Sequence, residues 1–127
     1  MKVPHTHVLL LEDQQDSFGA IKHYLGSHGY AMTVVRTGDE ALQMLDESEF
    51  DLFVCDLSLP EMSDLELIRA VREWHEIPSI AMGGSVDDRE IETCLAAGFD
   101  HHLAKPVNTN DLHAALQMFR RRHAFAS

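Results

Sequence analysis

Short apolar runs alternate along the whole chain with segments whose apolar residues recur every three or four positions. The runs predict strands, and the periodic segments predict helices that bury one face. We expect strands near 7–12, 30–36, 51–56, 78–83 and 100–104, and helices near 16–27, 38–48, 64–75, 86–97 and 109–122. Strands that alternate with helices in this order favour a parallel sheet.

Capping residues mark where the later helices begin. A short polar residue followed three positions later by an acidic one allows side chain and backbone to satisfy each other at a helix start. The pattern occurs at Thr37 with Glu40, Ser63 with Glu66, Ser85 with Asp88 and, in similar form, Asn108 with Asp111. Each pair precedes an apolar periodic segment, which supports the helix assignments.

Five strand–helix units with right-handed crossovers predict a doubly wound α/β fold, with a five-stranded parallel sheet and helices on both faces. The 127 residues are enough for one domain with its own core, and we expect a single domain over residues 1–127. No repeat or linker interrupts the alternation of elements.

The composition narrows the function classes. The formal net charge of -11 repels nucleic acid, and the basic run at 120–122 lies where a predicted helix ends and cations are favourable. The apolar stretches are too short to cross a bilayer, and the amino terminus lacks the layout of a secretory signal. We therefore expect a cytoplasmic protein that binds neither nucleic acid nor membrane.

Charged residues stand where three predicted strands end. Glu12 and Asp13 follow the first strand, Asp56 ends the third, and Lys105 follows the fifth. Because parallel strands deliver their carboxyl ends to one edge of the sheet, these side chains are expected to meet there. Carboxylate oxygens suit a hard divalent cation such as Mg²⁺, and a lysine beside them suits a phosphoryl group.

Each of these residues also has an ordinary structural explanation. Asp13 could begin the first strand–helix turn, Asp56 could cap the following loop through its side chain, and Lys105 could be a solvated surface amine. Taken singly, those explanations would be preferred. The coincidence of all these residues at one edge of the predicted sheet favours a functional site.

Three motifs together resemble one known family. Glu12-Asp13, Asp56 followed by Leu57-Ser58-Leu59-Pro60, and Lys105-Pro106 are similar to the motifs of the receiver domain of two-component response regulators, the CheY-like family. The resemblance spans nearly the whole chain and implies a flavodoxin-like fold. It also implies that Asp56 accepts a phosphoryl group from a phosphohistidine on a histidine kinase or histidine phosphotransfer protein.

The resemblance implies a role for each motif residue. Mg²⁺ would be held by carboxylates and one backbone carbonyl, namely Asp13, Asp56, Glu12 directly or through water, and the carbonyl of Ser58. Contacts to the phosphoryl group would come from Lys105, aimed by a cis bond to Pro106, and from the backbone amides of Gly83 and Gly84.

The chain departs from the family pattern at the residues that usually relay the signal. Gly83 stands where the family usually has Ser or Thr, and His102 stands where it commonly has Tyr or Phe. A third departure lies in the loop after the acceptor, where Asp64 replaces a usual Gly. We expect a changed output mechanism, in which phosphorylation orders the loop Gly83-Gly84-Ser85 through backbone amides. A histidine at 102 could also couple conformation to pH.

The favoured function is a phosphoacceptor signalling domain of a two-component system or phosphorelay, regulatory rather than enzymatic. It would bind its target through the face of the fourth and fifth helices and the fifth strand, and could form a homodimer.

One alternative is a degenerate receiver that binds proteins without phosphorylation. A phosphohydrolase related to haloacid dehalogenases is disfavoured because Ser58 stands where those enzymes have a second aspartate. A flavodoxin-like electron carrier is disfavoured because the first loop is acidic.

Overall fold

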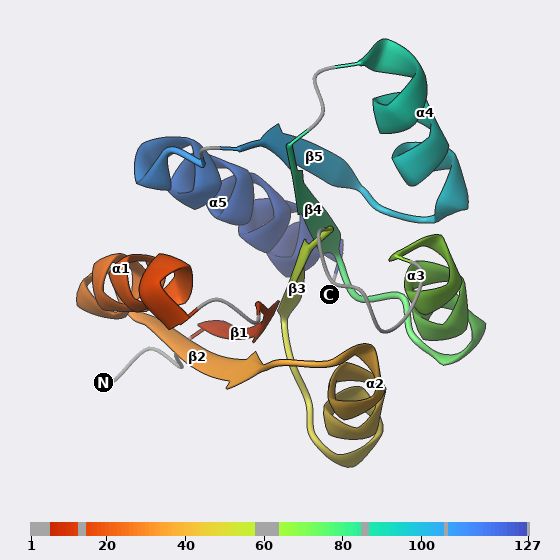
Figure 1. Cartoon of the computed structure of the whole chain (residues 1–127). Coiled ribbons are helices and arrows are strands. Elements are labelled where there is room, and N and C mark those ends of the chain that lie inside the picture. The colour runs from red at the N-terminus through yellow and green to blue at the C-terminus, as the bar shows by residue number, and fades with distance from the viewer. Residues whose placement is uncertain (1–5, 13–14, 58–63, 85–86, 106, 127) are drawn as a thin grey trace.

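The computed structural model describes residues 6–12, 15–57, 64–84, 87–105 and 107–126. Five strands and five helices alternate strictly along the chain, as Figure 1 shows. In chain order they are β1 (Thr6–Leu11), α1 (Gln15–Ser27), β2 (Tyr30–Val35), α2 (Gly38–Glu47), β3 (Leu52–Asp56), α3 (Asp64–Trp74), β4 (Ser79–Gly83), α4 (Asp88–Ala97), β5 (His101–Ala104) and α5 (Thr109–Ala126). Every predicted element is present, with ends shifted by a few residues at most.

The five strands form one sheet in the order β2-β1-β3-β4-β5, and every neighbouring pair is parallel. This order confirms the predicted doubly wound, flavodoxin-like α/β fold. The strand order reverses direction between β1 and β3, whose register pairs Leu11 with Cys55. The residues that follow this pair, Glu12 and Asp56, therefore reach the carboxyl edge of the sheet side by side.

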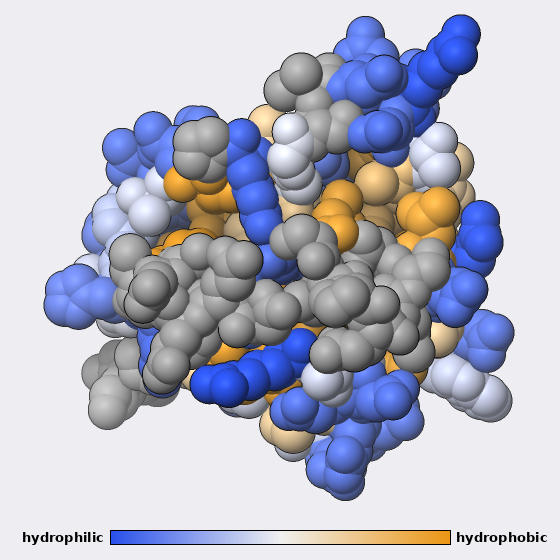
Figure 2. All heavy atoms as spheres, in the orientation of Figure 1, coloured by the Kyte–Doolittle hydropathy of each residue, from blue (hydrophilic) through white to orange (hydrophobic). Residues whose placement is uncertain are grey.

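The sheet separates two apolar layers. On one face, side chains of β1 such as Val8 and Leu10 pack with α1 and α5. On the other, Leu9 and Leu11 pack with α2 and α3, and part of α4 lies beside them. Consecutive strand residues thus enter opposite layers, as the pleat requires. In Figure 2 hydrophilic residues make up most of the outline of the molecule, and hydrophobic ones show mainly nearer its centre.

Two of the predicted helix caps are present and one is wrong. The hydroxyl of Thr37 accepts from the backbone amide of Glu40 at 3.1 Å, and the side chain of Asn108 accepts from the amide of Asn110 at 2.7 Å. Helix α4, in contrast, is capped by Asp87, whose carboxylate accepts from the amide of Arg89 at 2.8 Å, and not by Ser85. Asp87 is as good a cap as serine and lies immediately before the helix. The predicted cap at Ser63 lies outside the described residues.

Arg72 joins three segments at the amino edge of the sheet. From α3, its guanidinium donates to the carbonyls of Gly98 at 3.0 Å and Ile77 at 2.7 Å, and to the Asp100 carboxylate at 2.9 Å. The same Asp100 oxygen accepts from the amide of Ser79 at 2.8 Å. One arginine therefore ties the end of α3 to the start of β4 and to the turn between α4 and β5.

Within the described part of the chain, none of the helices combines the length and apolar character that crossing a bilayer requires.

Candidate functional site

Asp56 lies at the end of β3, the middle strand, and is completely buried. Its Oδ1 accepts a hydrogen bond from Nζ of Lys105, which follows β5. The lysine side chain remains 31% exposed, so the pair connects the buried carboxylate to the protein surface. An isolated buried carboxylate is costly, and a charged donor offsets that cost. The predicted meeting of Asp56 and Lys105 is thus confirmed by the geometry.

Glu12 occupies the equivalent place on the neighbouring strand. Its backbone amide donates to the carbonyl of Val35 at 3.0 Å, which extends the pairing of β1 with β2 by one residue. Only 2% of Glu12 is exposed. Two buried acidic residues therefore lie at the carboxyl ends of adjacent strands, at the edge where the strand order reverses.

The donor chemistry of this edge fits a hard divalent cation. Carboxylates of Glu12 and Asp56 are oxygen donors, and positive charge beside two buried acids lowers their repulsion. The other two predicted ligands, Asp13 and Ser58, lie outside the described residues. Among the residues that are described, no group of three or more histidine, cysteine, aspartate or glutamate side chains is placed to hold a metal ion. Only two of the four predicted ligands are described, so the set falls short of such a group. The two described carboxylates, of Glu12 and Asp56, are compatible with Mg²⁺.

Gly83, the last residue of β4, lies directly beside this pair. Its carbonyl accepts from the backbone amide of Lys105 at 2.8 Å, and the preceding Met82 carbonyl accepts from the amide of Leu57 at 2.9 Å. Gly84 is exposed, and a Cβ on it would meet nothing within 4 Å. The two glycines predicted to present backbone amides thus lie at the correct edge of the sheet. Pro106, predicted to aim Lys105, lies outside the described residues.

His102 lies closer to this edge than the sequence indicated. A Cβ placed on Gly83 would lie 3.0 Å from Nε2 of His102 and 3.0 Å from Cδ1 of Leu57. The imidazole therefore borders the space into which a side chain at position 83 would project. Burial, and then the nearby His101, lower the pKa of His102 below its ordinary value. Gly83 and His102 were both predicted as switch positions. Their closeness, and that of Leu57, was not predicted, because a sequence does not show how a side chain leans along its strand.

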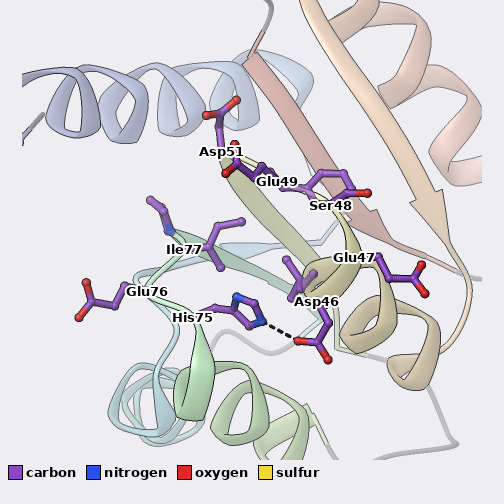
Figure 3. Close-up of a pocket in the computed structure, with 11 residues that line it drawn as sticks. Asp46, Glu47, Ser48, Glu49, Asp51, His75, Glu76 and Ile77 are labelled. Atoms are coloured by element: carbon purple, nitrogen blue, oxygen red, sulfur yellow. Dashed lines mark hydrogen bonds and ion pairs between the residues drawn. The ribbon is translucent and has the colours of Figure 1, made fainter.

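A separate hollow of about 790 Å³ lies at the opposite edge of the sheet, lined by residues 45–51 and 75–78 (Figure 3). Five of its lining residues are acidic: Asp46, Glu47, Glu49, Asp51 and Glu76. Three of these have structural partners. Asp46 accepts from the His75 ring at 3.0 Å, Glu47 accepts from the Gln43 amide at 3.1 Å, and Asp51 accepts from the amide of His7 at 2.8 Å. The hollow lies between the end of α2 with the segment leading into β3 and the segment that joins α3 to β4, away from Asp56.

Comparison with known proteins agrees with the geometry at the carboxyl edge. A family model described as the response regulator receiver domain matches residues 8–117. Transcription factor SKN7 of Saccharomyces cerevisiae is 33% identical over 111 residues, which cover 87% of this chain and 18% of that protein. The KDP operon transcriptional regulatory protein KdpE of Escherichia coli is 30% identical over 119 residues, covering 94% of this chain and 53% of that protein. The chain spans about half or less of the length of these relatives.

Solved structures show the same fold. The receiver domain of the Francisella response regulator 1452 superposes with a TM-score of 0.89 at 23% identity, covering 94% of this chain and 99% of that one. The receiver domain of the response regulator TorR, of the TMAO respiratory system, gives a TM-score of 0.87 at 26% identity, covering 94% and 98%. Taken with the family match over residues 8–117, these similarities show that the chain belongs to the response regulator receiver domains, which are regulatory phosphoacceptor modules rather than enzymes.

Proposed function

We propose that this receiver domain takes a phosphoryl group from a phosphohistidine onto Asp56 and thereby changes its binding to a protein partner. One observation carries the proposal: the completely buried Asp56 ends the middle strand, with the Lys105 ammonium on Oδ1 and the buried Glu12 at the end of the next strand. Burying two carboxylates here costs stability. A role in accepting a phosphoryl group would explain why two buried carboxylates are kept at this edge despite that cost.

The chemistry follows from these groups. One carboxylate oxygen of Asp56 attacks phosphorus, and the O–P bond forms as the bond from phosphorus to the donor imidazole breaks. The donor nitrogen keeps the electron pair and takes up a proton. Lys105, released from carboxylate oxygen to phosphoryl oxygen, balances the added negative charge, and the backbone amides of Gly83 and Gly84 are further donors. Transfer then depends mainly on position and charge.

Receiver domains typically bind Mg²⁺, and the residues proposed to hold it are Glu12, Asp13, Asp56 and the backbone carbonyl of Ser58. When bound, the ion supplies positive charge that neutralises the carboxylates and the phosphoryl oxygens. The buried oxygens of Glu12 and Asp56 support this assignment.

The donor and the target are proteins in this proposal. Receiver domains pair with histidine kinases, and we expect the donor to be such a kinase or a histidine phosphotransfer protein. The target would bind the face formed by α4, β5 and α5, where Leu95 and Met118 are 41% and 43% exposed. A homodimer could use the same face.

We further propose that residues 1–127 form a single receiver domain and that this domain acts in the cytoplasm. Gly83 and His102 would make its switch atypical.

Incubation with acetyl phosphate, followed by measurement of the intact mass, tests the function. The native chain should gain one phosphoryl group with Mg²⁺ present and far less with a chelator. Asp56→Asn should gain none, whereas Asp39→Asn, which alters an exposed acid in the first turn of α2, should behave as the native chain. Failure of the native chain to gain mass or bind Mg²⁺ would contradict the proposal and favour a platform that binds proteins without phosphorylation.

A further inference from the structure

The imidazole of His102 leans along β5 towards the functional edge of the sheet. In the register of β4 and β5, His102 pairs with Ala81. Its Nε2 nevertheless lies 3.0 Å from the Cβ position of Gly83, two residues farther along β4. Because the strands are parallel, two residues farther means closer to the carboxyl edge. The ring thus projects towards the edge that holds Asp56 and Lys105.

The place that the ring occupies is bounded by residues next to Asp56. Leu57 follows Asp56 in the chain, and its Cδ1 also lies 3.0 Å from the Cβ position of Gly83. The carbonyl of Gly83 accepts from the amide of Lys105, whose Nζ in turn donates to Asp56. His102 therefore lies beside Gly83, whose carbonyl is hydrogen-bonded to Lys105, the residue that contacts Asp56.

We propose that His102 is the side chain that detects phosphorylation of Asp56, with its Nε2–H donating a hydrogen bond to a phosphoryl oxygen through the space that the absent side chain at position 83 leaves. The inference rests on the proposed function and gives the switch residue His102 a specific contact within it. An imidazole has an N–H donor in either protonation state. A hydrogen bond to a phosphoryl oxygen is charge-assisted and stronger than one between neutral groups. Since α4 packs on β5, a shift of the ring would be transmitted to the proposed target face.

A purely space-filling histidine makes a different prediction. Phenylalanine at 102 would fill the same space without a donor, whereas glutamine would keep an N–H donor on a side chain of similar reach. The two variants therefore separate packing from hydrogen bonding. His101→Phe is the matched control, because the neighbouring strand position points to the opposite face of the sheet, where its ring lies 6.4 Å from that of Phe119.

The test uses the full chain with Mg²⁺ and beryllofluoride, a stable analogue of the phosphoryl group. Two-dimensional spectra of the imidazole nitrogens should show His102 Nε2 becoming a protonated, hydrogen-bonded nitrogen on addition of beryllofluoride, with His101 unchanged. Affinity for beryllofluoride should fall about tenfold in His102→Phe, as expected for a lost hydrogen bond to a charged group, and stay within about threefold in His102→Gln and His101→Phe.

Two results separate this inference from the function on which it rests. If Asp56 gains a phosphoryl group but the His102 signals do not change, or if His102→Phe binds beryllofluoride as tightly as the native chain, the role of His102 is overturned and the phosphoacceptor function stands. If the native chain neither gains mass nor binds beryllofluoride, both are overturned. The spectra are recorded on the native chain, so they do not depend on whether a variant folds.

Discussion

The ammonium of Lys105, which follows β5, donates to Oδ1 of Asp56, at the end of β3. Strand β4 lies between these two strands, so the ion pair bridges the carboxyl end of β4. The pair sets an electrostatic competition at the edge of the sheet. A cation bound by Glu12 and Asp56 would share a carboxylate with the lysine, whereas a phosphoryl group would attract both positive charges.

Replacing Lys105 should therefore affect the two ligands in opposite directions. We expect Lys105→Ala to bind Mg²⁺ about fivefold more tightly, because about 1 kcal/mol of repulsion between like charges is removed. Phosphorylation by acetyl phosphate should become slower by about tenfold or more, because a group that balances phosphoryl charge is lost. Titration calorimetry and the rate of mass gain measure the two effects. Lys22→Ala, an exposed lysine on α1, is the control; parallel changes in both quantities would contradict the competition.

A methyl group at position 83 should destabilise the fold. The added Cβ of Gly83→Ala would lie 3.0 Å from both His102 Nε2 and Leu57 Cδ1, and overpacking of this kind lowers the free energy of unfolding by about 1–3 kcal/mol. Gly84→Ala is the control, since its Cβ would have open space. In a His102→Ala background the cost of Gly83→Ala should become smaller, because one of the two close contacts is gone.

Urea denaturation followed by far-ultraviolet circular dichroism measures these changes. Fluorescence is a poor monitor, because the single tryptophan, Trp74, is already 81% exposed in the folded protein. Equal costs for the two glycine substitutions would show that the contacts around Gly83 do not limit packing.

Arg72 should contribute more to folding than any other arginine on α3. Removing its side chain leaves the carbonyls of Gly98 and Ile77 without their charged donor, and we expect Arg72→Ala to lower the free energy of unfolding by about 2 kcal/mol. The ion pair with Asp100 adds little to this figure, because that carboxylate is 42% exposed. Arg69→Ala, an exposed position one turn earlier, should change stability by less than about 0.5 kcal/mol. Arg72→Lys should recover only part of the loss, since an ammonium cannot reproduce the planar fork.

His102 should make the fold sensitive to mild acid. Burial first, and then His101, lower the pKa of His102 from its ordinary value of 6.5. The unfolded chain therefore takes up the proton at a higher pH than the folded chain does. Stability is retained above pH 6.5 and is lost as the pH falls through the lowered pKa of the folded state.

In His102→Phe this part of the acid loss should disappear. Thermal unfolding midpoints recorded between pH 7.5 and 5 should fall less steeply for His102→Phe than for the native chain. His23→Phe, at an exposed position on α1, should retain the native slope. Matching slopes for the native chain and His102→Phe would mean that this histidine titrates alike in both states.

Much of the fold could be predicted because the signals are local. Alternating periodicities located every element, and the caps at Thr37 and Asn108 are as expected. The start of α4 was misjudged because Ser85 and Asp87 are both good caps, and spacing alone does not rank them. The network of Arg72 was not foreseen, since its acceptors lie up to 28 positions away and meet it only through the fold.

The candidate site was predictable to the extent that strand ends determine it. Asp56, Glu12 and Lys105 reach the same edge because each follows a strand of a parallel sheet. The lean of His102 towards Gly83 depends on side-chain direction and packing. The sequence shows only that both residues differ from those that the family usually has at these positions.

The burial of Glu12 beside Asp56 has an evolutionary consequence. Neutral replacements at either position would remove a destabilising repulsion, so a more robust scaffold is accessible by single substitutions. Such variants would lack the acids on which the proposed chemistry depends. Selection for durability and selection for signalling therefore oppose each other at this edge, and a laboratory search for heat-resistant variants would be expected to accumulate inactive ones there.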